Sequence, residues 1–259
     1  MNIVVLVKQV PDSGAERNLR SDDNTVDRAS ADNVINEMDE YAIEEALRIK
    51  EAHGGEVTIL TMGPQRATES IRKALSMGPD KAVHVLDDAL HGSCAVATSK
   101  VLAAALRTLN ADLVLCGALS TDGGVQVIPH MLAERLGIAA LTGARRLTVD
   151  GPALTAERQT EEGYEVVTAT TPAVVSVWDT INEPRYPSFK GIMAAKKKPV
   201  QTLSLADLGV AADEVGLAGA TSAVLEHSKR PPRSGGQKIV DEGSGGVSLV
   251  EFLSAEKFV

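Results

Sequence analysis

The chain has 259 residues, of which 44% are hydrophobic and 24% charged, a composition typical of a folded globular protein and not of a disordered one. Its 35 acidic residues outnumber its 26 Lys and Arg residues, which leaves a net charge of -9, and its aromatic residues are only one Trp, three Tyr and three Phe. Because nucleic-acid binding usually depends on a basic surface and on aromatic platforms for the bases, this composition excludes a nucleic-acid-binding function.

The chain begins with an apolar segment that has no features of a targeting signal. Residues Ile3 to Val7 follow Met1 and Asn2 directly, with no basic region or cleavage site, and the sequence contains no apolar run of 18 residues. The two cysteines, Cys94 and Cys116, lack the spacing of a zinc or redox motif, so we expect both to be reduced. These features predict a cytoplasmic protein with no direct membrane insertion.

Short apolar segments alternate with longer helical patterns through most of the chain. The expected strands are rich in β-branched residues and comprise Ile3–Val7, Val57–Met62, Ala82–Leu86, Leu113–Cys116 and Ala173–Val177. The expected helices comprise Asp39–Ala52, Gln65–Met77, Ala95–Leu109 and Val125–Leu136. Strands that alternate with helices of this length are typical of βαβ units, which predicts a Rossmann-like α/β fold: a mostly parallel sheet with helices on both faces.

The pattern changes after Leu136. Polar and apolar residues alternate in 144–149, 153–160 and 163–171 around two turn signals, which predicts antiparallel hairpins added to the α/β core. From Gly209 onward the sequence is rich in Ala, Gly, Ser and Pro, and only Val247–Phe258 has the amphipathic pattern of a helix. We therefore expect an α/β domain over residues 1–208 and an extended C-terminal arm over residues 209–259.

Motifs of a self-sufficient catalytic centre are missing from the sequence. The five histidines lack the spacing of a metal site, GxSxG and GxxxxGK[ST] do not occur, and no GxGxxG follows the first strand. We expect the carboxylates of the first long helix to lie on a solvated face rather than to form an acid/base pair; they are Glu37, Asp39, Glu40, Glu44 and Glu45. We therefore expect no catalytic residue and no metal ion.

Residues 117–127, called here the glycine loop, follow an expected strand and lead into an expected helix. Unpaired backbone N–H groups of residues 123–126 at the helix start could bind a phosphate together with the Ser120 and Thr121 hydroxyls, since the loop contains no Lys or Arg. Alternatively, Asp122 caps the helix and the glycines only form the turn. Ligands of open α/β sheets bind beyond the C-terminal strand ends, where residues 7–9 and 62–64 should meet this loop, and this convergence favours a nucleotide site.

Residues 182–198, called here the docking loop, form a second unusual segment. Three aromatic residues, Trp178, Tyr186 and Phe189, lie in it or just before it, next to lysines at 190 and 196–198. Exposed apolar side chains beside cations could dock an acidic partner, because charges steer the encounter and apolar anchors supply contact energy. The alternative is a loop folded back on the core, with its aromatic residues buried and its lysines solvated.

Four segments of the chain resemble the β subunit of electron transfer flavoproteins. They are Val7–Asp12, Asn36 with Glu40–Arg48, Gly117–Gln126 and Asn182–Lys198, of which the last is the most specific, and the likeness covers about residues 1–209. The resemblance implies a Rossmann-like fold related to that of adenine nucleotide hydrolases. It also implies an electron carrier rather than an enzyme, paired as a heterodimer with an α subunit that holds most of a redox-active FAD.

The resemblance further implies a structural AMP in the β subunit, bound at the ends of the strands. Carried over by position, its contacts are Leu6, Asn36, Glu37, Met38, Asp39, Met62, Gly117, Ala118, Leu119, Ser120, Thr121, Asp122, Gly123, Gly124, Val125, Gln126 and Val127. Many members of the family have a Lys-Gln pair where this chain has Ala118-Leu119. We therefore expect only the backbone part of that cradle here.

The docking loop resembles the segment with which the family receives flavin dehydrogenases of the acyl-CoA type, as in fatty acid β-oxidation, before electrons pass to a quinone oxidoreductase. The expected docking residues are Arg185, Tyr186, Phe189, Lys190, Ile192, Met193, Lys196, Lys197 and Lys198. Phe189 stands where the family commonly has the smaller Leu. We expect the C-terminal arm to wrap the α subunit.

Three other interpretations stay open at this point. One branch of the family replaces AMP with a second FAD and bifurcates electrons from NADH; it shares the opening motifs of this chain but lacks the Asn182–Tyr186 run. An adenine-nucleotide hydrolase or a nucleotide-sensing regulator would also suit the fold. The hydrolase is disfavoured because Val7 is followed by Lys8-Gln9-Val10-Pro11-Asp12 instead of the SGGxDS loop of such enzymes.

Overall fold

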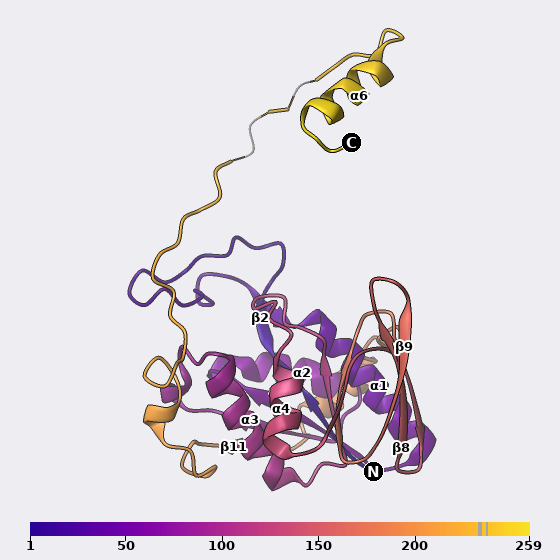
Figure 1. Ribbon diagram of the computed structural model, residues 1–259. Helices are drawn as coiled ribbons and strands as arrows, with labels where there is room; N and C mark the ends of the chain where they lie inside the picture. The colour runs from indigo at the N-terminus through magenta and orange to yellow at the C-terminus, as the bar shows by residue number, and fades with distance from the viewer. Residues whose placement is uncertain (233–234, 237) are drawn as a thin grey trace. The chain divides into compact units, whose positions relative to one another are not determined.

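Nine strands form one sheet in the order β11-β5-β4-β1-β6-β10-β7-β8-β9, whose two edge strands, β11 and β9, are labelled on opposite sides in Figure 1. The computed structural model describes residues 1–232, 235–236 and 238–259. The strands of this sheet are β1 (Asn2–Leu6), β4 (Glu56–Met62), β5 (Lys81–Val85), β6 (Leu113–Gly117), β7 (Ala139–Asp150), β8 (Ala153–Gln159), β9 (Tyr164–Thr170), β10 (Ala173–Val177) and β11 (Val200–Leu203). The order reverses at β1, because the chain adds β4 and β5 on one side of it and then returns to add β6 on the other.

The strands from β11 to β7 run parallel, and their registers bring the C-terminal ends to one edge of the sheet. Leu6 pairs with Leu60, and Val177 pairs with Gly117, so β1, β4, β6 and β10 end close together. The remaining strands, β8 and β9, extend the sheet as antiparallel neighbours of β7. This arrangement creates the switch point at which ligands of open α/β sheets bind.

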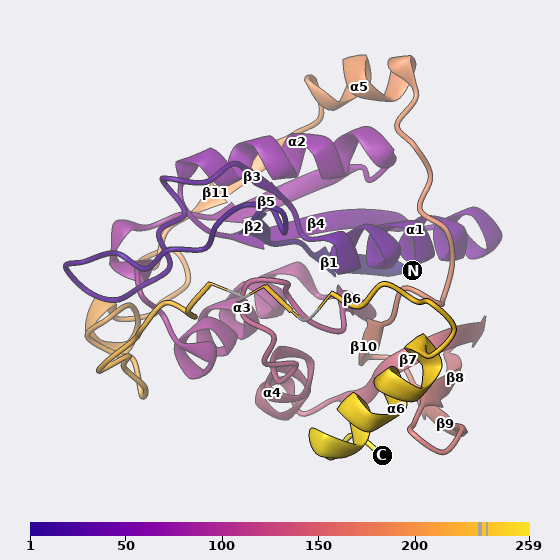
Figure 2. The same ribbon diagram turned by 90° about the horizontal axis from the view of Figure 1, so that it is seen from above.

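Helices cover both faces of the sheet, and Figure 2 shows α1 (Glu37–His53) and α2 (Thr68–Met77) on the face opposite to α3 (Ala95–Leu109) and α4 (Ile128–Leu136). Successive residues of β1 point to opposite faces: Ile3 and Val5 pack under α1 and α2, whereas Val4 and Leu6 pack under α3 and α4. Burial on both faces explains why these strands are apolar throughout instead of alternating. Each buried Val, Leu or Ile side chain contributes about 1.5–3 kcal/mol relative to exposure.

The expected fold class is confirmed, including the antiparallel hairpins, and most expected elements are present. Two boundaries were wrong. The helix α4 begins at Ile128 rather than at Val125, because Pro129 lies in its first turn, where proline is favoured. The strand expected over 144–149 begins earlier, since β7 starts at Ala139. Three short strands were not expected. They are β11, β2 (Gln9–Pro11) and β3 (Asn33–Ile35), and the last two form a separate antiparallel pair.

The contacts divide the chain into two units, Met1–Val224 and Leu225–Val259. Residues 209–224 pack on the first unit, since Val215 is buried and Leu217 contacts Gly92. In the described part of the second unit lies the helix α6 (Gly245–Ala255), which overlaps the expected terminal helix Val247–Phe258. Whether residues 209–259 act together as an arm around a partner stays a prediction. None of the helices in the described ranges combines the length and apolar character that crossing a bilayer requires.

Candidate functional site

Asn36, the residue before α1, ties the start of this helix to the glycine loop. Its side-chain amide donates to the Asp39 carboxylate (2.9 Å) and to the Leu119 carbonyl (2.9 Å), and its side-chain oxygen accepts from the Thr121 N–H (3.1 Å). Every polar atom of this buried side chain is therefore used. The structure thus brings together two of the expected site segments, residues 36–39 and the glycine loop.

Asp39 joins the same start of α1 to the ends of β1 and β6. Its buried carboxylate accepts from the Lys8 N–H (2.8 Å), from Asn36 and from the Gly117 N–H (3.3 Å). Burial raises the pKa of this carboxyl to about 7, and the three hydrogen bonds oppose the increase only in part. A group that titrates near neutral pH therefore lies at the centre of the candidate site.

Asp122 of the glycine loop is held by two cations from outside the loop. Its side chain is only 1% exposed and accepts from Lys8 Nζ (2.7 Å) and from the Arg28 guanidinium, while Lys8 Nζ also reaches the Ser120 hydroxyl (3.2 Å). Burial opposes ionisation of Asp122, but the two positive charges outweigh it and lower its pKa to about 2. The carboxylate therefore stays charged and fixes both cations beside the loop.

These contacts correct two expectations about the glycine loop. The N–H groups of Gly123 and Gly124 are not free, since both donate to the Ser120 carbonyl (3.2 and 2.8 Å), and α4 begins three residues later than expected. Asp122 does not cap that helix either. The loop has no cation of its own, but Lys8 and Arg28 supply two, so positive charge is available to a phosphate there.

The other expected nucleotide contacts surround this network. Leu6 ends β1 and is buried in the core under α3 and α4, against which Met62 at the end of β4 also packs. Met38 lies against Gly117, where an added Cβ atom would be only 2.5 Å from the Met38 Cβ. Glu37 and residues 123–126 are exposed. Their role as nucleotide contacts stays a prediction.

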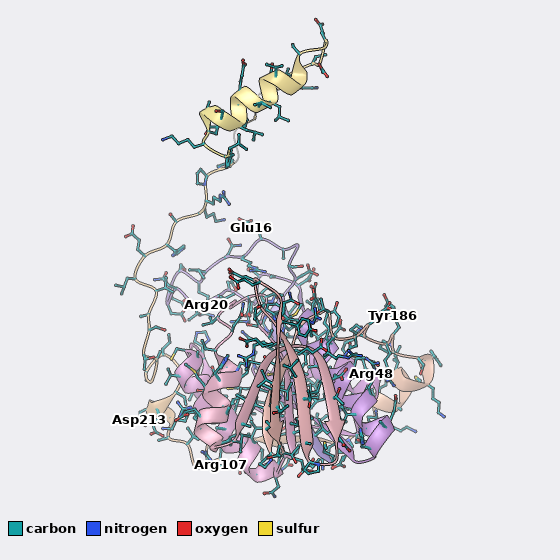
Figure 3. All side chains as sticks on the ribbon, turned by 45° about the vertical axis from the view of Figure 1, so that its right-hand side comes forward. Glu16, Arg20, Arg48, Arg107, Tyr186 and Asp213 are labelled. Carbon is teal, nitrogen blue, oxygen red and sulfur yellow. The ribbon has the colours of Figure 1, made fainter. Side chains whose placement is uncertain are left out.

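The docking loop exposes its apolar residues instead of folding them into the core. Tyr186 is 92% and Phe189 80% exposed, and Figure 3 shows the Tyr186 side chain pointing away from the sheet and helices. Ile192 and Met193 of the short helix α5 (Phe189–Ala195) are also exposed. A hollow of about 390 Å³ is lined by residues of the loop and of the end of α2, with Tyr186, Lys190 and Lys198 among them.

The start of the docking loop is anchored to α1 by the polar residues of its Asn-Glu-Pro-Arg run. Arg185 donates to Glu44 (2.7 and 3.0 Å) and to Glu51 (2.5 and 3.2 Å), and Asn182 donates to Glu45 (3.0 Å). Glu44 and Glu45 are buried, as is Asp39, so the expectation of a fully solvated acidic face on this helix was wrong. Glu44 and Glu45 are buried where the docking loop contacts them, through Arg185 and Asn182.

The end of the docking loop is fixed to α2. A Cβ atom on Gly191 would lie 2.5 Å from the Ser76 carbonyl oxygen, so only glycine permits this contact. Lys198 donates to the Leu75 carbonyl (3.0 Å), and burial together with the nearby Lys50 charge lowers its pKa. Among the expected docking residues, Arg185 and Lys198 therefore support the loop, whereas Lys190, Lys196 and Lys197 are exposed.

The fold and this site define an α/β protein with a polar network at the switch point of a parallel sheet and a separate, exposed loop. The chain belongs to the electron transfer flavoprotein family, because the family model described as "Electron transfer flavoprotein domain" matches residues 23–208. It is similar to proteins named electron transfer flavoprotein subunit beta. The identity is 53% with that of Mycobacterium leprae and 52% with that of Mycobacterium tuberculosis, in each case over 100% of this chain and 99% of the relative. The protein of that name from Thermoanaerobacterium thermosaccharolyticum is 39% identical over the full length of both chains. The resemblance seen in the sequence is confirmed.

Proposed function

We propose that this chain is the β subunit of a heterodimeric electron transfer flavoprotein and acts as an electron carrier in the cytoplasm. An α subunit holds most of the FAD, which supplies the redox chemistry, and this chain supports it and binds a structural AMP. Electrons enter from flavin dehydrogenases of the acyl-CoA type and leave toward a quinone oxidoreductase. The observation that carries the proposal is the docking loop, whose exposed apolar residues are held on α1 and α2 by buried polar contacts.

The network at the strand ends fits an AMP by the chemistry of its groups. Lys8 and Arg28 provide positive charge for a phosphate, and the Ser120 hydroxyl lies within hydrogen-bonding distance of Lys8. Leu6 and Met62 provide apolar surface for a purine at the ends of adjacent strands. Asn36 and Asp39 hold the surrounding backbone in place, so the site does not depend on the ligand for all of its contacts.

The exposed surface of α6 supports a partner subunit. Four apolar residues are exposed on this eleven-residue helix: Val247, Leu249, Val250 and Phe252. Exposed apolar surface of this kind usually marks an interface. We propose that the α subunit covers it. A helix this apolar gains stability from packing more than from its own propensity.

Expression of the chain with and without an α subunit tests the main proposal. Material from the pair should contain one FAD and one AMP per heterodimer after extraction and chromatography, and the chain alone should be colourless. Yellow protein from the chain alone, with one flavin per polypeptide, would contradict the proposal. Two FAD molecules per heterodimer, with oxidation of NADH, would instead show the bifurcating function.

The docking role is tested by Phe189→Ala in the heterodimer. Removal of this 80% exposed ring should slow electron acceptance from an acyl-CoA dehydrogenase and leave the flavin content unchanged, because the ring contributes contact area to the partner and not to the core. Val166→Ala on β9 removes another exposed apolar side chain and serves as the control. Loss of flavin in Phe189→Ala, or equal rates in all three proteins, would argue against a docking function.

A further inference from the structure

The connection between β2 and β3, residues 12–32, is called here the strap, and Figure 2 shows it as a long loop that extends beyond those two strands. Its base is closed by the antiparallel pairing of β2 with β3, and Leu19 pairs with Val26 across its two limbs. The returning limb carries Arg28, whose guanidinium contacts Asp122 of the glycine loop. The strap therefore reaches the candidate nucleotide site through Arg28.

The tip of the strap is held to the turn before α3 by a largely buried carboxylate. Asp23, whose side chain is 15% exposed, accepts from the ring Nε2 of His91 (2.7 Å). Its other oxygen accepts from the Thr25 N–H (2.9 Å) and from the Thr25 hydroxyl (2.7 Å), so both oxygens of the carboxylate are occupied. His91 directly follows the 3-10 helix η2 (Asp88–Leu90), which comes after β5. The tip cannot leave this turn without breaking the contact with His91.

The segment 215–224, called here the stem, is held by the same turn. The Leu217 N–H donates to the His91 carbonyl (2.9 Å). The stem also contacts the strap directly, since the Asn24 side chain at the tip donates to the Val224 carbonyl (3.0 Å). Val224 is the last residue of the first unit. His91 therefore binds the stem with its backbone and the strap with its side chain.

We propose that the strap and the stem form one clasp, joined at His91, which retains the nucleotide of the candidate site. With the stem in place, Asp23 and Asn24 fix the tip, and the returning limb keeps Arg28 on Asp122. Without these contacts the strap opens and the nucleotide dissociates faster. The inference rests on the proposed nucleotide site and goes beyond it. It assigns three residues that are not among the expected nucleotide contacts, His91, Asp23 and Asn24, as positioning residues that act through Arg28.

The rate of AMP release from the full chain tests the clasp. His91→Ala removes the contact with Asp23 and keeps the backbone contact with the stem. It should speed AMP release roughly 3- to 10-fold, as expected for the loss of one hydrogen bond. His91→Gln, whose amide can still donate to Asp23, should recover most of the wild-type rate. The rates are measured by chasing bound radiolabelled AMP with an excess of unlabelled AMP.

Asn24→Gly tests the direct contact between the strap and the stem. Asn24 has a left-handed backbone with a φ of 55°, which glycine adopts freely, so the substitution removes the side-chain amide without straining the turn. It should also speed AMP release roughly 3- to 10-fold. Asn110→Gly makes the same change at a φ of 47°, at the opposite end of α3 from the clasp, and should release AMP at the wild-type rate.

Hydrogen exchange separates the clasp from the nucleotide site. His91→Ala should speed amide exchange in the strap of the ligand-free chain, and AMP should slow exchange in the stem of the wild type, because coupling between two sites is reciprocal. Unchanged strap exchange and unchanged AMP release in His91→Ala would refute the clasp alone. Faster exchange in β8 and β9 as well would show a general loss of stability and argue against it. A wild-type chain that binds no AMP would refute the nucleotide site, and the retaining role of the clasp with it.

Discussion

The contacts of Arg185 allow a quantitative comparison between a buried and an exposed ion pair that share one guanidinium. The side chain of Glu44 is 8% exposed and that of Glu51 is 59% exposed, yet both accept two hydrogen bonds from the Arg185 guanidinium, and Glu44 accepts a third from the Arg185 backbone N–H (3.2 Å). An exposed pair contributes about 0.2–1 kcal/mol, whereas hydrogen bonds to a charged group of low exposure contribute about 1.5–3 kcal/mol. We therefore expect nearly all the energy of the contact to come from Glu44.

Double-mutant cycles measure the two pairs separately. Arg185→Met is combined with Glu44→Gln in one cycle and with Glu51→Gln in the other, and unfolding is followed by the fluorescence of Trp178, the only tryptophan, which precedes the docking loop. The coupling energy should be about 1.5–3 kcal/mol with Glu44 and below about 1 kcal/mol with Glu51. Arg185→Met alone should lower the melting temperature by roughly 4–10 °C, as expected for a domain of this size.

A control and a clear contrary result complete this design. Arg48→Met removes a cation on α1 that is more than half exposed and lies 3.6 Å from Glu45, farther than Arg185 lies from Glu44. This substitution should change stability by less than about 1 kcal/mol. Equal coupling energies for Glu44 and Glu51 would refute the reasoning, because burial would then not decide the strength of the contact. The docking loop would have to be held by other groups.

Three further predictions concern other parts of the molecule. Gly191→Val should destabilise the seat of α5 on Ser76 by about 1–3 kcal/mol, as overpacking does, and speed proteolysis within the docking loop; wild-type resistance to protease would contradict the contact. The folded-state pKa of Asp39, about 7, lies above the ordinary value of 3.8 for this side chain, so its stabilising contribution is complete below pH 4 and is lost as the pH rises through 7. The stability advantage of the wild type over Asp39→Asn should therefore shrink by up to about 4 kcal/mol between pH 4 and pH 8 in urea unfolding, and a constant difference would speak against it. Burial opposes ionisation of the Cys94 thiol, but hydrogen bonding to Thr221 and to nearby backbone lowers its pKa to about 7, whereas burial raises the pKa of Cys116. Iodoacetamide at pH 7.5 should therefore label Cys94 first in the folded protein. Labelling of Cys116 at a similar rate would be inconsistent with its burial.

Local patterns predicted the parallel core because its strands and helices are long and strongly periodic. The strands β2 and β3 have three residues each and no measurable periodicity, so their pairing could not be predicted from the sequence. The start of α4 was misplaced because the glycines and polar residues before it resemble a helix entry. Pro129 was the signal that could have located the first turn.

The candidate site depends on residues that are distant in sequence, and this limited its prediction. The meeting of residues 7–9 with the glycine loop followed from strand order, and the contact of Lys8 with Asp122 confirms it. Arg28 is 94 residues from Asp122, in a connection without regular pattern, and nothing local marks it as a partner. The burial of Glu44 and Glu45 was missed for the same reason, since the residues that cover them lie 141 and 137 positions away.

The strand β7 belongs to two structures at once. Its first residues pair in parallel with β10, and its later residues pair antiparallel with β8, with irregular register on both sides near Ala144. Gly143, with a φ of 70°, adopts the irregular backbone there, and its N–H donates to the Ser176 hydroxyl (2.9 Å) instead of to a neighbouring strand. The sheet nevertheless extends from the strands beside the candidate nucleotide site to the outer hairpin, since β7 pairs with β10 on one side and with β8 on the other. A partner that binds the outer hairpin would therefore act on the whole sheet. We expect the hairpin and the parallel core to move together as one rigid body and not about a hinge.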